Sequence, residues 1–243
     1  MIAADVHAGD PGWWASLRHG GLLVAPSRLA GFPDGRASAL TQLQVDRLRT
    51  AVTNASTLNT ETIGRLVGTV LTEVLGLDRG SWSRREGIGD EWSHRLVTGE
   101  ALRPRWLWRG VYDQALPIFL AEVPGGEVGG RLGLGRSRRT IARVNEWLRL
   151  ARRPVAVVTN GRQFRLVHAG PEYEAFCEWD TSLWFVQGGP SPQVTALRTL
   201  LGRQAIQSPG PGQPSPLVEA ILASRKGQSE LSVLLGELSL IHI

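Results

Sequence analysis

A short cluster of arginines is the part of this sequence best suited to chemistry with an anion. Arg136, Arg138 and Arg139 lie within one short run, and Arg143 follows one helical turn later. A guanidinium group binds phosphate oxygens in pairs, and the backbone N–H groups of a helix N-terminus also favour an anion. We therefore expect DNA-binding residues at Arg136, Arg138, Arg139 and Arg143, with a solvated basic helix face as the equally weighted alternative.

Other residues with chemical potential lack the partners that their chemistry requires. Leu132-Gly-Leu-Gly135 has neither the preceding strand nor the third spaced glycine of a dinucleotide-binding loop. His168 has no histidine or cysteine at metal-ligand spacing, and Cys177 is the sole cysteine, so the sequence predicts no metal site and no cofactor site. The nine tryptophans are more typical of a core than of base-stacking residues.

The overall charge and hydropathy are compatible with a nucleic-acid partner. The formal net charge is +5 and the sequence pI is about 10.5, although all but one of the 27 basic residues are arginines, which weakens the signal. The chain shows no apolar run of about 18 residues and no secretory signal, so we expect a cytoplasmic protein with no membrane partner.

Alternating apolar patterns predict a mixed α/β fold that positions the arginine cluster. A glycine-rich segment at 125–135 predicts a mobile loop, and the arginines open the helix expected at 138–151. A hairpin follows, in which Asn160-Gly161 is the turn between strands at 155–158 and 163–168. The pattern also predicts helices at 38–51 and 60–75, the second capped by Thr60-Glu61, a surface loop at 78–94, strands at 106–111, 117–123 and 174–179, and a helix at 194–201.

The order of strand, helix and Thr159-Asn-Gly hairpin resembles the nuclease-like N-terminal domain of restriction enzymes. The resemblance spans about residues 60–185 and implies a restriction-endonuclease-like sheet with flanking helices. In that family an Asp and a Glu hold a divalent metal while a Lys steadies the attacking water. The resemblance places the acids at Asp113 and Glu122, but Pro124 replaces the lysine, so we expect a degenerate nuclease domain. A metal-dependent nuclease using Asp113 and Glu122 is the alternative.

Five further segments together resemble the N-terminal part of adenine-specific DNA methyltransferases of type IIG restriction systems and of BREX and DISARM phage-defence islands. The resemblance implies that this chain supplies DNA contact or domain docking, with double-stranded DNA and other proteins of the defence system as partners. No Pro-Pro dipeptide of the catalytic motif occurs, so S-adenosylmethionine is expected only for the full-length protein. A non-enzymatic adaptor of a defence complex is a further alternative. The segments are Glu146-Trp-Leu-Arg149, Thr159–Arg165, Glu178–Phe185, Gln193–Leu201 and Ser215–Leu231.

These resemblances and the composition divide the chain into six parts. The last six residues resemble translated sequencing adapter, and we expect the source gene to continue in frame beyond Glu237. The expected parts are an N-terminal lead-in and helix (1–58), the restriction-endonuclease-like domain (59–187), a short helical extension (188–207), a Pro/Gly linker (208–216), the start of a helical connector to a methyltransferase domain (217–237) and the artefact (238–243).

Overall fold

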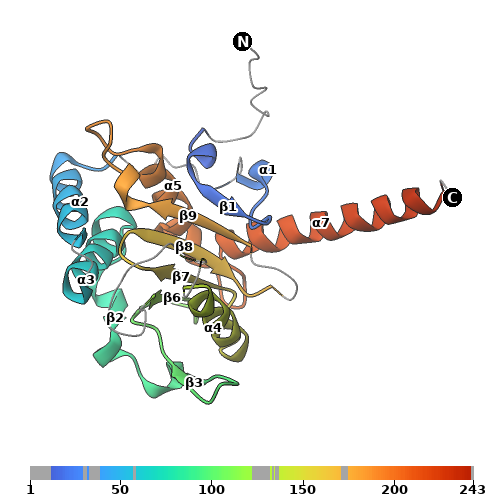
Figure 1. Ribbon diagram of the computed structural model, residues 1–243, viewed down its shortest axis with the longest axis horizontal. Helices are drawn as coiled ribbons and strands as arrows, with labels where there is room; N and C mark the ends of the chain where they lie inside the picture. The colour runs from blue at the N-terminus through green and yellow to red at the C-terminus, as the bar shows by residue number, and fades with distance from the viewer. Residues whose placement is uncertain are drawn as a thin grey trace, which may run out of the picture.

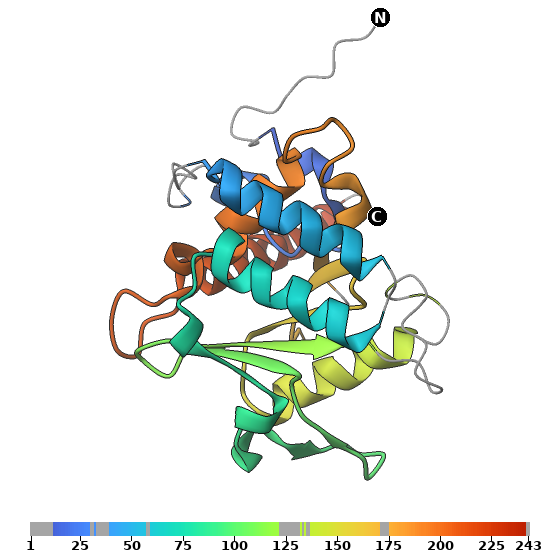
Figure 2. The same cartoon turned by 90° about the vertical axis from the view of Figure 1, so that its left-hand side faces the viewer.

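A mixed β-sheet with helices on both faces forms the centre of the molecule (Figures 1 and 2). The computed structural model describes residues 12–29, 32, 39–56, 59–121, 132, 134, 137–170 and 175–241, giving the backbone alone for 137 and 231–241. Within these residues seven strands share the sheet in the order β1-β9-β8-β7-β6-β5-β2. The strands are β1 (Arg18–Gly20), β2 (Trp82–Arg84), β5 (Trp106–Arg109), β6 (Ala115–Leu120), β7 (Val155–Thr159), β8 (Gln163–His168) and β9 (Phe176–Asp180). This confirms the mixed α/β class.

One parallel pair interrupts an otherwise antiparallel sheet. Strands β6 and β7 run parallel, and the helix α4 (Ser137–Leu150) lies between them in the chain. Parallel neighbours require a crossover connection, which a helix usually supplies. Strands β2 and β5, β5 and β6, β7 and β8, β8 and β9, and β9 and β1 all pair antiparallel. The predicted strands at 106–111 and 117–123, the helix at 138–151 and the strand at 174–179 are therefore confirmed, with small shifts of their ends.

The turn between β7 and β8 is held by its own side chains. Asn160 Oδ1 accepts hydrogen bonds from the backbone N–H groups of Arg162 (3.1 Å) and Gln163 (2.6 Å). Thr159 Oγ1 donates to the Gln163 carbonyl at 2.7 Å. Gly161 has φ +86°, a left-handed conformation that favours glycine, which explains the Asn-Gly pair and confirms the predicted hairpin.

Two hydrophobic clusters cover the two faces of the sheet. Helices α3 (Thr60–Thr69) and α5 (Pro192–Leu201) lie on one face, and α2 (Gln42–Ala55) packs against α3, as Figure 2 shows for α2 and α3. The other face is covered by α4, whose buried Trp147 donates its indole N–H to the Trp92 carbonyl at 3.2 Å. The sheet is therefore the middle of three layers.

The first helices begin with side-chain caps. Thr41 caps α2 in a capping box with Gln44. The cap of α3 is Asn59, whose side chain accepts from the Thr62 N–H at 2.8 Å, so the predicted Thr60 cap was wrong by one residue. After α3 a π-helical turn (Val70–Val74) continues to Gly76, whose φ of +67° ends it where the sequence predicted.

The segments on either side of the expected central domain join its core. Trp14 near the N-terminus, Leu197 of α5, Ala205 of α6 (Arg203–Ile206) and Leu217 at the start of α7 (Pro216–Ile241) belong to the same hydrophobic cluster. The short helix α1 (Pro26–Leu29) contacts α7. In the 208–216 segment the Ser208 hydroxyl lies within hydrogen-bond distance of the carbonyls of Gly210 (2.6 Å) and Gln213 (2.7 Å) and can donate to either. That segment thus forms an ordered turn against the body, beyond which α7 projects (Figure 1).

The polar stretch from 78 to 94 contains an edge strand as well as turns. Its Trp82–Arg84 segment is β2, which pairs with β5 in the register Arg84↔Trp106, so the prediction of a loop over the whole stretch was wrong. A separate hairpin of β3 (His94–Arg95) and β4 (Ala101–Leu102) follows. In the part of the chain that the structure describes, none of the helices combines the length and apolarity that a membrane crossing needs.

Candidate functional site

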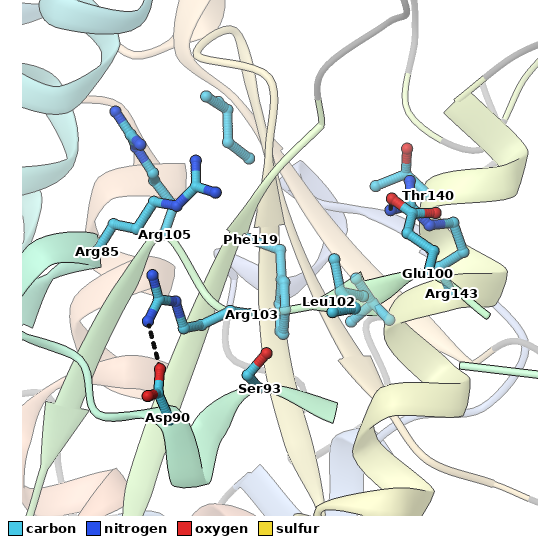
Figure 3. Close-up of a pocket in the computed structure, with 13 residues that line it drawn as sticks. Arg85, Asp90, Ser93, Glu100, Leu102, Arg103, Arg105, Phe119, Thr140 and Arg143 are labelled. Atoms are coloured by element: carbon cyan, nitrogen blue, oxygen red, sulfur yellow. Dashed lines mark hydrogen bonds and ion pairs between the residues drawn. The ribbon is translucent and has the colours of Figure 1, made fainter. Parts of the chain in front are cut away.

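A cavity of about 380 Å³ lies on the α4 face of the sheet, beside the end of β6 and the start of β5 (Figure 3). Four arginines and two carboxylates line it. Arg85, Arg103 and Arg105 gather on one side, and Arg143 of α4 lies across the cavity with Glu100. The remaining lining residues are Asp90, Ser93, Ala101, Leu102, Phe119, Leu120, Thr140 and Val144.

Two of the four arginines are paired with acids. Arg103 lies 3.4 Å from Asp90 and also donates to the Ile88 carbonyl at 3.2 Å. Arg143 forms an ion pair with Glu100. Because both acids are largely exposed, these pairs are screened by solvent and hold the side chains only weakly.

The other two arginines have no acidic partner among the described residues. Arg105 precedes β5 and is positioned by its backbone N–H, which donates to the Ile118 carbonyl at 2.8 Å. Arg85 directly follows β2 in a short 3-10 helix (Arg85–Gly87). Pairing of β2 with β5 therefore brings residues from two neighbouring strand ends to one cavity, where none of the described acids pairs with their charges. Such a cavity attracts an anion.

The arginines predicted from the sequence lie partly beside this cavity. Arg143 lines it, and Arg139 is one helical turn earlier on α4, so the two share a helix face. Arg138 and Arg139 are exposed in the first turn of α4, which holds no acidic residue. Cations there are repelled by the positive end of the helix dipole, and a bound anion would reduce that repulsion. Arg136 lies outside the described residues.

Only one of the two acids of the nuclease hypothesis, Asp113, lies among the described residues. Asp113 is in the turn before β6 and has φ +60°. It forms a bidentate ion pair with Arg153, in which Arg153 Nη2 lies 2.9 Å from Oδ1 and Nη1 lies 3.1 Å from Oδ2. Glu122 lies outside the described residues but follows Ala121, which comes directly after β6. Five rises of about 3.3 Å separate the ends of this six-residue strand by about 17 Å. The fold therefore does not bring Asp113 to the end of β6 where Glu122 follows.

A buried ion pair between β8 and β9 holds the segment that precedes α4. Arg165 and Glu178 are only 2% and 3% exposed, and Arg165 Nε donates to Glu178 Oε2 at 2.8 Å. Gln163 Nε2 donates to the other carboxylate oxygen at 2.8 Å. Gln163 and Arg165 also bind the backbone of Leu132. Gln163 Oε1 accepts a hydrogen bond from the Leu132 N–H at 2.8 Å, and Arg165 donates to the Leu132 carbonyl at 2.6 Å. This network has a structural role: it fixes one point of the glycine-rich segment against the sheet.

The remaining titratable groups of interest, His168 and Cys177, are buried. Burial, with a smaller contribution from Arg225, lowers the pKa of His168 to about 4. Burial raises the pKa of the Cys177 thiol far above its ordinary range, so this thiol stays protonated and inert. In the described ranges no three His, Cys, Asp or Glu side chains gather as metal ligands would.

Sequence reasoning found Arg143 but missed Arg85, Arg103 and Arg105. The available signal was their crowding, in Arg84-Arg85 and in Arg103-Pro-Arg105. What it could not show is the pairing of β2 with β5, which brings the two runs together. No protein-family model, curated protein or solved structure matches this chain.

Proposed function

We propose that this chain binds the phosphate backbone of double-stranded DNA through the arginine-lined cavity beside α4. The observation that carries the proposal is the presence of Arg85 and Arg105, without acidic partners among the described residues, in a cavity that Arg103 and Arg143 also line. Like charges held around one cavity repel each other, and a phosphate group relieves that repulsion while accepting paired guanidinium hydrogen bonds.

The proposed contact is to the backbone and therefore independent of base sequence. Arginines neutralise phosphates and release condensed counterions, which gives affinity that falls steeply with salt. The exposed Arg138 and Arg139 extend the basic surface along α4 from Arg143. Contacts of this kind set position and orientation on DNA, and base contacts elsewhere would specify a target.

The protein context that we propose is an adenine-specific DNA methyltransferase of a restriction or phage-defence system. The order α3, β2, β5, β6, α4, β7, β8 supports a restriction-endonuclease-like domain, and the Thr159-Asn-Gly hairpin closes it as the resemblance implies. The domain serves DNA contact or docking in a cytoplasmic protein. Methyl transfer from S-adenosylmethionine to adenine is proposed only for the full-length protein. It is not proposed for this chain, because the sequence holds no Pro-Pro dipeptide of the catalytic motif.

The salt dependence of DNA binding tests the proposal. Fluorescence anisotropy with a labelled blunt duplex of mixed sequence gives the slope of log affinity against log salt concentration. Replacing both Arg85 and Arg105 by Ala should reduce that slope by about 0.9 for each lost phosphate contact. A duplex of unrelated sequence should give the same change.

The matched control removes the same charge elsewhere. Arg28 of α1 and Lys226 of α7 are exposed and do not line the cavity, so the variant Arg28→Ala/Lys226→Ala has the same net charge as the test variant. It should keep nearly the wild-type slope. Equal slopes for the test variant and wild type would overturn the proposal.

A further inference from the structure

Three cavities follow one another around the end of the sheet. Arg105 lines both the cavity beside α4 and a second one of about 430 Å³. Arg65 and Arg84 line both this second cavity and a third of about 680 Å³ between α2, α3 and β2. Because neighbouring cavities share lining residues, they form one path, which we name the arginine track.

Each cavity of the arginine track holds arginines that have no acidic partner among the described residues. In the third cavity Arg79 and Arg84 have no acidic partner among the described residues, as Arg85 and Arg105 have none in the first. Arg47 and Arg65 are paired with Glu73 at 2.8 Å and with Glu61 at 2.5 Å. The acids Asp46 and Glu86 also line the track.

The arginine track passes from one face of the sheet to the other. The first cavity contains Phe119, which belongs to the hydrophobic cluster under α4. The third contains Trp82, which packs against the opposite cluster under α2 and α3. The second cavity joins them where Arg84 of β2 pairs with Trp106 of β5.

Because the arginine track crosses from one face of the sheet to the other, it can accommodate single-stranded nucleic acid more readily than duplex. Duplex DNA is stiff over about 150 base pairs, so bending it around the end of a sheet is costly. A single strand bends freely, and its bases can stack on aromatic side chains. Trp82 is half-buried in the third cavity with the Arg84 guanidinium carbon 5.9 Å from its ring centroid, which offers both an aromatic surface and a cation.

We infer that the second and third cavities of the arginine track bind a single-stranded stretch of nucleic acid that continues from the duplex held beside α4. The inference rests on the proposed function and adds the form of the substrate: a junction between duplex and single strand. Arg79 and Arg84 are its specific phosphate-binding residues.

A comparison of blunt and overhanging duplexes tests this inference. The probes are one labelled duplex with blunt ends and the same duplex with a thymidine overhang of about ten nucleotides, on the 5′ or the 3′ strand. At least one overhang should bind the wild-type chain more tightly than the blunt duplex. In the variant Arg79→Ala/Arg84→Ala that gain should vanish, with a salt slope lower by about 0.7 for each lost single-strand contact, while blunt binding is unchanged.

Two controls separate this site from the cavity beside α4. Arg79→Lys/Arg84→Lys keeps the charges and should keep most of the overhang gain, whereas Arg28→Ala/Lys226→Ala should keep all of it. Thermal unfolding by circular dichroism checks that each variant is folded.

Each outcome of this comparison decides between the two proposals. Equal affinity for blunt and overhanging probes, or a gain that survives in Arg79→Ala/Arg84→Ala, overturns the single-strand inference. The proposed function then stands if blunt binding still depends on Arg85 and Arg105. Absence of binding to every probe overturns both.

Discussion

Two arginines of the same sheet, Arg165 in β8 and Arg105 before β5, occupy opposite environments. Arg165 is 2% exposed, is paired with Glu178 and packs over the Phe176 ring with its guanidinium carbon 3.8 Å from the centroid. Arg105 is half-buried, lines a cavity and has no acidic partner in the described part of the chain. A fully buried charge requires a partner because desolvation is costly, whereas a charge that water still reaches does not. The first arrangement therefore stabilises the fold, and the second remains available to a ligand.

Removing the buried cation should have the largest effect on stability. Arg165→Met leaves the Glu178 carboxylate buried with Gln163 and the more distant Arg18, at 3.2 Å, as its remaining partners among the described residues. We expect a loss of about 3–5 kcal/mol in the free energy of unfolding, measured by urea denaturation. The double variant Arg165→Met/Glu178→Met should be less destabilised than the single one. A single variant as stable as wild type would show that this pair does not hold the sheet.

The pair of Arg225 with His168 should have an intermediate effect on stability, because the partner of the arginine here is a neutral imidazole and not a carboxylate. Arg225 Nη1 donates to His168 Nδ1 at 3.0 Å, since a guanidinium has no acceptor. The pKa of His168 is lowered from 6.5 to about 4, mainly by burial. Between these values the unfolded chain binds a proton that the folded chain does not, so stability should fall as the pH falls from 6.5 to 4.

The variant His168→Gln separates this histidine from the carboxylates that titrate in the same range. Its urea midpoint should depend less on pH between 6.5 and 4 than that of the wild type. Parallel curves for the two proteins would mean that His168 is not the group responsible.

The smallest effect on stability is expected at the candidate site. Arg85→Ala/Arg105→Ala removes one exposed and one half-buried charge, neither with an acidic partner among the described residues, so the free energy of unfolding should change by no more than about 0.5 kcal/mol for each substitution. Urea denaturation of the same preparation used for DNA binding measures it. A loss comparable to that of Arg165→Met would place these arginines among the residues that hold the fold.

Local patterns made most of the central fold predictable. The Asn160-Gly161 turn was readable because the requirement for positive φ lies within the turn itself. The amphipathic helix α4 and the strands β5, β6 and β9 were readable because each carries its own apolar period. These elements depend little on distant parts of the chain.

The elements and residues that sequence reasoning missed depend on distant partners. Strand β2 has three residues and is stabilised by its pairing with β5. No local sequence pattern predicts that pairing. The burial of Arg165 depends on Glu178 of β9, and the cavity beside α4 depends on the meeting of two arginine runs. Within the candidate site, the helix that carries Arg143 was therefore predictable from the sequence. The arginines opposite it could be identified only from the three-dimensional structure.

The two outermost strands of the sheet affect how the molecule behaves at high concentration. Both β1 and β2 are only three residues long, and each includes an arginine, Arg18 or Arg84. An exposed strand edge is a template on which another chain can add a strand and begin aggregation. Short edges offer few unpaired backbone groups, and a charged side chain on the edge makes it a poorer template, so edge-to-edge pairing of one sheet with another is disfavoured.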